Sequence, residues 1–148
     1  MTTTHDRDQR SAEHLVERLL DLWARPIRDS REARSAFGRL YADPVTINGT
    51  DLPLQALVDR SAQMHASLER TDVRVVDVVS SPGKVVVAFD MTARHIGTWR
   101  SALGDVSPTN RTVTIRAVDI LTVEDDLITE IVVVSDEVSL LAQLGVHL

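Results

Sequence analysis

A long β-hairpin, predicted within residues 111–136, most constrains what this chain can fold into. Two runs rich in β-branched residues flank an acidic turn at 124–126, which is typical of a hairpin. Because successive side chains of a strand point to opposite faces, Asp119 is expected on an otherwise apolar face. A carboxylate among apolar side chains needs a polar partner or a chemical role. The members of that face are Val113, Ile115, Ala117, Asp119, Leu121 and Val123.

The bulk composition limits the classes of partner and compartment. The 148 residues predict one domain over 11–148, preceded by a flexible tail at 1–10. A net charge of −6 without a basic cluster argues against nucleic acid and against anionic membranes. No apolar run is long enough for a membrane span. The absence of cysteine excludes disulfide and thiolate chemistry and favours a cytoplasmic location.

Hydrophobic periodicity predicts three helices in the first half of the chain. The first is expected to begin at Ser11 as N-cap and to end before Pro26. The second is expected to begin at Ser30, and the third to use Asp51 as its capping carboxylate.

The second half is predicted to be almost entirely β-structure. This order of elements is typical of an α+β domain, in which N-terminal helices cover one face of a curved antiparallel sheet. The expected elements are strands at 45–48, 72–79 and 84–96, a loop at 97–110, the hairpin, and a last helix at 138–144 capped by Asp136.

Alternation along the 84–96 strand separates two groups of side chains. Phe89, Met91 and His95 share one face, which is expected to line a pocket. Asp90 and Arg94 share the other face, where they are expected to form a surface ion pair worth little.

Four further residues are candidates for binding a small molecule, each with a structural alternative. Ser61 and His65 interrupt the apolar stripe of the third helix, so His65 is either a pocket donor or a core histidine. Tyr41 and Asn48 flank the first strand, where they either orient a ligand oxygen or serve as core-edge and turn residues.

Trp99 and Asp119 also admit two interpretations. Trp99, in the 97–110 loop, is either a lid over an apolar ligand or a hydrophobic plug. Asp119 is either an acid/base group or half of a structural ion pair with an arginine on an adjacent strand. His65 and Glu69 are one helical turn apart, but no further ligand accompanies them, so no metal site and no cofactor are expected.

Three pieces of the sequence resemble the SnoaL-like polyketide (ester) cyclase family: Arg-His-Ile-Gly at 94–97, Pro-Thr-Asn-Arg at 108–111, and the segment 136–145. The resemblance covers most of the chain from Leu15 onward. It implies a cone of the nuclear-transport-factor type, in which a curved antiparallel sheet and helices enclose one deep apolar pocket. It also implies ring closure by an intramolecular aldol reaction without metal or cofactor.

The same resemblance assigns the catalytic positions of the family. Family cyclases use an aspartate on the final strand, helped by a histidine on the preceding strand. Counted back from Asp136 without a gap, these positions carry Val133 and Asp119. Val133 cannot transfer a proton, so either the acid/base role has moved to Asp119, or the pocket binds without catalysis. The limonene-type epoxide hydrolases, a related branch with an Asp-Arg-Asp cluster, make a migrated aspartate plausible.

The predicted function is cofactor-free cyclisation or isomerisation of a polyketide-type intermediate, or opening of an epoxide in one. Asp119 and His95 are the predicted catalytic residues. The alternative is a non-catalytic binding or assembly protein of the same fold. A homodimer is expected through an apolar sheet face carrying Val118, Ile120, Ile128, Val132 and Val134. The predicted substrate-binding residues are Tyr41, Asn48, Ser61, His65, Phe89, Met91, Trp99 and Val133.

Overall fold

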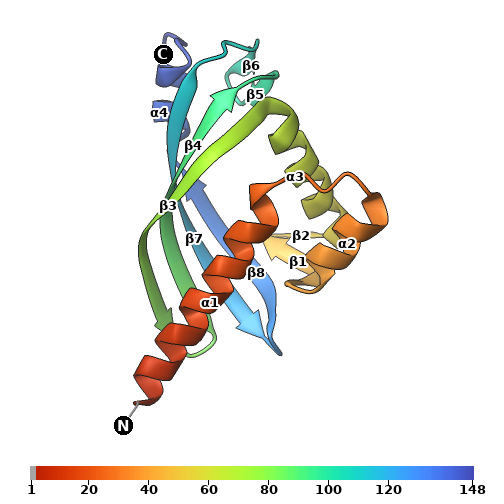
Figure 1. The fold of residues 1–148 in the computed structure, drawn as a ribbon, viewed down its shortest axis with the longest axis vertical. Helices are drawn as coiled ribbons and strands as arrows, with labels where there is room; N and C mark the ends of the chain where they lie inside the picture. Colours follow the sequence, from red (N-terminus) through yellow and green to blue (C-terminus); the bar gives the residue numbers. More distant parts are fainter. Residues whose placement is uncertain (1–2) are drawn as a thin grey trace.

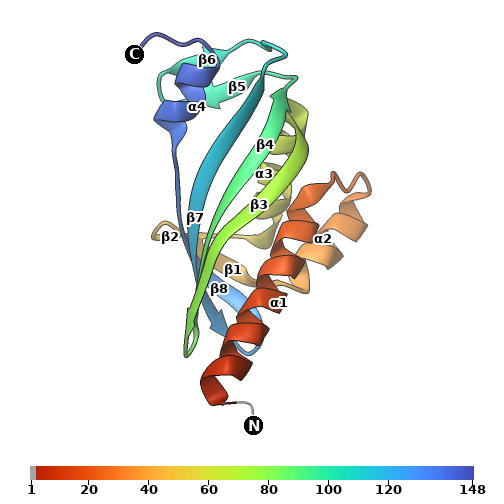
Figure 2. The same ribbon diagram turned by 60° about the vertical axis from the view of Figure 1, so that its left-hand side comes forward.

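The computed structural model describes residues 3–148 as an α+β fold with a six-stranded sheet (Figure 1). The long strands curve around the side on which α1 and α3 lie, and α4 and the β5–β6 hairpin lie at the end remote from the N-terminus (Figure 2). The elements are α1 (Thr4–Ala24), α2 (Ser30–Gly38), β1 (Tyr41–Ile47), β2 (Thr50–Leu52), α3 (Leu54–Ser67), β3 (Leu68–Ser81), β4 (Lys84–His95), β5 (Trp99–Ser101), β6 (Gly104–Val106), β7 (Thr112–Glu124), β8 (Leu127–Ser135) and α4 (Glu137–Gln143).

The strand order is β2-β1-β8-β7-β4-β3, and the curved sheet is mixed rather than antiparallel as predicted. The pair β1–β8 is parallel, whereas β1–β2, β3–β4, β4–β7 and β7–β8 are antiparallel. Hairpin turns force their two strands to be antiparallel, but β1 and β8 are far apart in sequence and are under no such constraint. Their direction is therefore decided by how the helices return the chain to the sheet.

The first helix is longer than the sequence predicted. It begins at Thr4, because Thr3 and Asp6 form a reciprocal capping box that satisfies free backbone N–H groups. Residues 4–10, predicted as a flexible tail, are therefore helical. The side-chain amide of Gln9 donates to the carbonyl of Val78 at 2.8 Å and fixes this segment to β3.

The other helix caps were predicted with mixed success. Asp136 caps α4, and its carboxylate accepts from the backbone N–H of Ser139, as expected. In α2 the N-cap is Asp29 rather than Ser30.

The predicted capping carboxylate of α3 is wrong. Asp51 lies in β2 and accepts from the hydroxyl of Thr46 at 2.7 Å, whereas the N-cap position is held by Pro53. The carboxylate of Asp43, in β1, accepts from the backbone N–H of Leu54 at 3.0 Å and so satisfies the first turn of α3 from a neighbouring strand.

In β4 and β7 the side chains that were predicted to share the apolar face do lie on the inner face of the sheet, which is the face toward α1 and α3. In β8 the register shifts near Thr129, so that Ile128 and Ile131 both point inward and Ile128 is fully buried. The expectation that Ile128 belongs to the exposed face is therefore wrong. A similar shift near Thr71 in β3 keeps both Arg70 and Val73 on the inner side.

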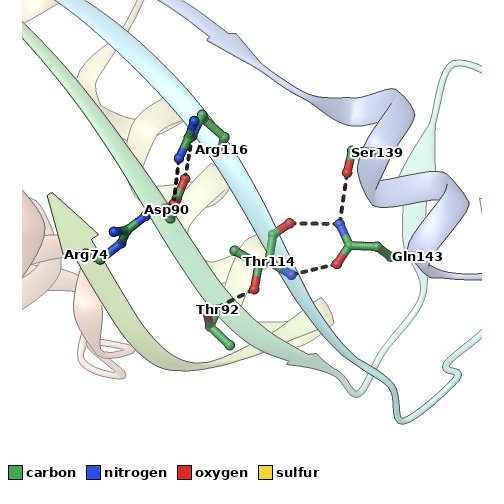
Figure 3. Close-up of polar contacts among 7 residues, drawn as sticks. All are labelled: Arg74, Asp90, Thr92, Thr114, Arg116, Ser139 and Gln143. Atoms are coloured by element: carbon green, nitrogen blue, oxygen red, sulfur yellow. Dashed lines mark hydrogen bonds and ion pairs between the residues drawn. The ribbon is translucent and has the colours of Figure 1, made fainter. Parts of the chain in front are cut away.

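The opposite, outer face of the sheet is polar near α4. Asp90 forms ion pairs with Arg74 and Arg116, both at 2.8 Å, and not with Arg94 as predicted (Figure 3). These hydrogen bonds hold the pKa of Asp90 below its usual range. Arg94 instead pairs with Glu69 at 3.3 Å.

The remaining edge of β7 is covered by α4. Strand β8 pairs with β7 only as far as Ala117, which leaves the backbone of Thr114 without a strand partner on that side. The side-chain amide of Gln143 replaces the missing strand, because it accepts from the N–H of Thr114 and donates to its carbonyl, both at 2.8 Å (Figure 3). This contact fixes α4 at the open end of the sheet.

Candidate functional site

A cavity of about 260 Å³ lies between the inner face of the sheet and the helices. Its walls are mainly apolar, and its volume approaches the lower end of the range for small-molecule sites. A larger, more open depression of about 600 Å³ lies between α1 and the β3–β4 turn, but contains none of the predicted site residues. The polar lining residues of the cavity are Arg60, Arg70, Asp119, Ser135 and Glu137, and the apolar ones include Trp23, Phe89, Met91, Trp99 and Val133.

Asp119 lies on the cavity wall, in β7, as alternation predicted. Its cross-strand neighbours are Val87 on β4 and Val133 on β8. Its Oδ1 atom is buried and has no hydrogen-bond partner, and burial raises the pKa of the carboxyl to about 6. Among the ion pairs of residues 3–148 none involves Asp119, so the alternative of a structural ion pair is wrong.

Trp23, which is half-buried and lines the cavity, is hydrogen-bonded to the buried Tyr41. The indole N–H of Trp23 donates to the Tyr41 hydroxyl at 2.8 Å, and the ring of Tyr41 stacks on Phe37. Burial raises the pKa of Tyr41, and the nearby negative charge of Asp119 raises it further. Tyr41 therefore stays a neutral phenol close to the carboxylate, although it does not line the cavity itself.

Arg70 also faces the cavity, from the N-terminal end of β3, close to the end of α3. One of its terminal nitrogens donates to the backbone carbonyl of Trp23, whereas its Nε atom is buried without a partner. Burial lowers the pKa of this guanidinium. Arg70 was not among the predicted site residues, because the strand was predicted to begin at Asp72, beyond the register shift that turns Arg70 inward.

Trp99 lines the cavity from β5, and its indole Nε1 is buried without a partner. The connection before it is tied to α3, since the hydroxyl of Ser67 donates to the carbonyl of Thr98 at 2.7 Å. A side chain at Gly97 would collide with the carbonyl of Ala66, so this close approach requires glycine. Trp99 is thereby held over the cavity by a fixed connection.

His95 does not belong to the cavity. It is fully buried, and its Nδ1 accepts from the backbone N–H of Thr109 at 3.1 Å, which assigns the ring proton to Nε2. Asp119 is opposite Val87, about eight residues from His95 along β4, or roughly 25 Å of extended strand. The structure therefore separates the two residues that were predicted to transfer protons together.

Three other predicted residues lie away from the cavity wall. Asn48 is an exposed turn residue with a φ of 48°, and its side-chain oxygen accepts from the N–H of Val133 at 2.9 Å. This contact supports the turn interpretation. Ser61 is buried in α3. His65 is half-buried, and burial and the charge of Arg70 lower its pKa.

The structure thus brings five predicted residues together around the cavity and adds four polar residues that were not predicted. Ser135 could have been found, because alternation along β8 places it on the same face as Val133. Arg60, Arg70 and Glu137 carry no such local signal. The five predicted residues are Phe89, Met91, Trp99, Asp119 and Val133.

Among the described residues there is neither a metal-binding cluster nor a membrane-spanning helix. Within residues 3–148, no three histidine or carboxylate side chains gather where they could hold a metal ion. No helix in the same range is long and apolar enough to cross a bilayer.

Solved structures with the same fold come from several bacteria. TsrD from Streptomyces laurentii superposes with a TM-score of 0.76 at 17% identity, over 95% of this chain and 98% of that one. AclR, a putative hydroxylase from Streptomyces galilaeus, gives 0.71 at 18% identity, over 93% and 97%. IdmH, a putative polyketide cyclase from Streptomyces antibioticus, gives 0.70 at 21% identity, over 91% and 99%.

At these identities the similarity shows a shared fold, and the chemistry of the relatives does not transfer with it. No curated protein matches the sequence significantly. The model of one family, described as SnoaL-like polyketide cyclase, matches residues 13–144, which is nearly the whole chain. The chain therefore belongs to the SnoaL-like polyketide cyclase family.

Proposed function

We propose that this protein is a cofactor-free cyclase or isomerase of a polyketide-type intermediate, with Asp119 as its acid/base group. The observation that carries the proposal is the unpartnered, desolvated carboxylate of Asp119 on the wall of an apolar cavity. A pKa of about 6 suits a group that must accept and return a proton near neutral pH.

The reaction requires a single proton-transfer group. The carboxylate of Asp119 removes a proton from a carbon between two carbonyl groups of the substrate, and the resulting enolate carbon attacks a second carbonyl carbon in the same molecule. A carbon–carbon bond forms as the carbonyl π-bond breaks, and the protonated Asp119 returns its proton to the new alkoxide. No oxidant or reductant is consumed. The apolar walls limit access of water, which would otherwise compete for the proton.

The surroundings of Asp119 support this role. Tyr41 remains a neutral phenol beside the carboxylate, and Val133 and Val87 flank it with apolar side chains. The same protonated carboxyl suits donation of a proton to an epoxide oxygen, so epoxide opening stays within this proposal.

The second candidate function is binding without catalysis. Val133 at the family's acid/base position favours it, because the residue that catalyses ring closure in the family is replaced by a side chain that cannot transfer a proton. This candidate keeps the same cavity and the same class of ligand.

One experiment separates the two candidates. A panel of linear and monocyclic poly-β-ketone esters is incubated with the wild type, with Asp119→Asn and with Asp90→Asn, and ring closure is followed by mass spectrometry and NMR. Asp90 is the matched control, because it is a carboxylate on the outer face of the sheet. We expect Asp119→Asn to lose a factor on the order of 10²–10⁴ in rate, and Asp90→Asn to retain the wild-type rate. Binding of the panel without turnover by the wild type would favour the second candidate.

We further propose that the protein is a homodimer, paired through the part of the outer face that lies toward the β3–β4 and β7–β8 turns. Val79, Val86, Ile120 and Val132 are register neighbours across four strands and form one apolar row. A second row carries Ala88, Val118 and Val134. Several of these side chains are exposed, and a continuous apolar area of this kind is typical of a subunit interface.

A further inference from the structure

Arg70 stands apart from the arginines that surround it on the sheet. Arg74, Arg94 and Arg116 all lie on the outer face and pair with carboxylates of neighbouring strands. Arg70 is turned to the inner face, and among the ion pairs of residues 3–148 it forms none. Its positive charge therefore faces the cavity without a carboxylate at ion-pair distance among the described residues.

Only part of the hydrogen-bonding capacity of Arg70 is used by the protein. A guanidinium has five N–H donors, and the backbone carbonyl of Trp23 accepts from one terminal nitrogen. The Nε–H is buried and has no acceptor. An uncompensated, partly desolvated cation is costly, so an anionic oxygen in the cavity would recover energy that the protein alone does not.

A second donor without an acceptor lies in the same cavity. The indole N–H of Trp99 is buried and unpartnered. Trp99 packs against the core cluster that contains Leu68 and Ala93, and these two residues are near Arg70 in the sheet. Both orphaned groups on this part of the wall are therefore donors. They match a ligand group that only accepts hydrogen bonds.

The reacting end of the cavity is elsewhere. Arg70 is opposite Ala93, whereas Asp119 is opposite Val87 on the same strand. These two positions on β4 are about six residues apart, or at most roughly 20 Å along an extended strand, less where the sheet curves. An anion bound by Arg70 is thus held away from the carboxylate of Asp119, which avoids repulsion between like charges.

We propose that Arg70, assisted by the indole N–H of Trp99, binds an anionic oxygen of the substrate at the end of the cavity remote from Asp119. The substrate class is then an elongated, mainly apolar molecule with one acidic oxygen, either a carboxylate or the enolate of a β-dicarbonyl. This inference deepens the proposed function and rests on it for the identity of the reacting end. The binding of the anion itself does not require that the protein catalyse anything.

Arg70 also has a structural role that the test must separate. Its donation to the carbonyl of Trp23 places a cation at the C-terminal end of α1, where the helix dipole is negative. If this were its whole purpose, loss of the side chain would lower stability and would weaken neutral and anionic ligands alike.

The experiment compares an anion and a neutral ester of one skeleton, and adds an enolate as a second kind of anion. Affinities are measured by calorimetry for naphthoate, for methyl naphthoate, and for a phenyl-substituted cyclic β-diketone present as its enolate. The proteins are the wild type, Arg70→Met, Arg70→Lys, and Arg74→Met as an outer-face control on the same strand. Thermal melts of each variant report the structural role separately.

We expect the wild type to bind at least one anion about tenfold or more tightly than the neutral ester. Arg70→Met should abolish this preference while keeping the ester affinity, Arg70→Lys should restore part of it, and Arg74→Met should keep it. A preference for naphthoate alone identifies a carboxylate, and one for the diketone alone identifies an enolate. Anions bound no more tightly than the ester, including no measurable binding of any probe, would overturn the inference, as would an equal loss of both in Arg70→Met.

The two proposals fail independently. Asp119→Asn should keep the anion preference even though it loses ring closure. If the protein prefers anions but no variant turns over a substrate, the anion site at Arg70 is supported and the catalytic proposal fails. If the protein turns over a substrate but shows no preference for anions, the catalytic proposal is supported and the anion site fails.

Discussion

Asp119 on β7 and Val133 on β8 lie directly opposite each other, and both side chains line the cavity. Cross-strand neighbours have Cβ atoms about 5 Å apart. Val133 holds the position at which the resemblance to the family expects the acid/base aspartate. The carboxylate of this protein therefore reaches the cavity from the strand adjacent to that position.

The first prediction concerns the pH dependence of stability at Asp119. The pKa of Asp119 is raised to about 6, above its usual value of 3.8, so the folded state binds a proton more tightly than the unfolded state. The stabilising effect of protonation is complete below about pH 4 and is lost as the pH rises to about 6. Above pH 6, ionised Asp119 then costs the fold about 3 kcal/mol.

Asp119→Asn removes this titration. Urea denaturation from pH 4 to pH 8 should show that the variant is more stable than the wild type above pH 6, by up to about 3 kcal/mol, and that the difference narrows toward pH 4. In the wild type, the rate of ring closure should rise through about pH 6 as the base form appears. Parallel stability curves for the two proteins would contradict the assignment.

The second prediction concerns Val133→Asp, which restores a carboxylate at the family position. Two carboxylates on opposed, desolvated positions cannot both ionise cheaply, so the pair should share a proton and titrate in two separated steps. We expect lower stability above pH 6 and a gain in aldol-type ring closure. Thr114→Asp, at an exposed position on the polar part of the outer face, is the control and should give neither effect.

The third prediction tests the Trp23–Tyr41 pair by a double-mutant cycle. Trp23→Phe leaves the buried Tyr41 hydroxyl without its donor, and Tyr41→Phe leaves the Trp23 N–H without its acceptor. Each single change should destabilise the protein by about 1–3 kcal/mol. The double variant should cost less than the sum of the two, because no unpaired polar atom of the pair remains. Strict additivity in urea denaturation would show that the hydrogen bond contributes nothing.

The fourth prediction concerns assembly. Light scattering at micromolar concentration should give about twice the chain mass of 16.4 kDa. Ile120→Lys places a charge in the apolar row of the outer face and should shift the protein toward the monomer. Thr114→Lys, on the same strand within the polar part of that face, should remain dimeric. A wild type of monomer mass at all concentrations would refute the interface.

The fifth prediction concerns metal ions. Within residues 3–148 the side chains form no cluster with the ligand number that a metal site needs. Dialysis against EDTA should therefore leave both ligand binding and ring closure unchanged. Loss of either property, with recovery on addition of zinc or iron, would show that a metal takes part.

The local patterns of the sequence determined much of the fold. Period-two alternation in β4 and β7 placed Phe89, Met91 and Asp119 on the inner face, because the pleat of a strand fixes side-chain direction without reference to any other element. The turn between β7 and β8 was equally local. Asp125 and Asp126 both adopt positive φ angles there, which a tight hairpin requires.

Irregularities in the strands were not visible in the same patterns. The register shifts near Thr71 and Thr129 each reset the alternation, which is why Arg70 was missed and Ile128 was placed on the wrong face. A bulge depends on how the partner strand is held, so a strand read alone continues its period.

The candidate site itself was decided by tertiary structure. Alternation put His95 and Asp119 on one face, but the register of β4 against β7 set them at different heights, and only Asp119 meets the cavity. At the end of α1, Trp23 forms hydrogen bonds with both Tyr41 and Arg70. No spacing in the sequence indicates that these three residues meet. Side-chain direction is a local property of the backbone, whereas the distance between two side chains depends on strand register and helix packing, and these are set by the whole chain.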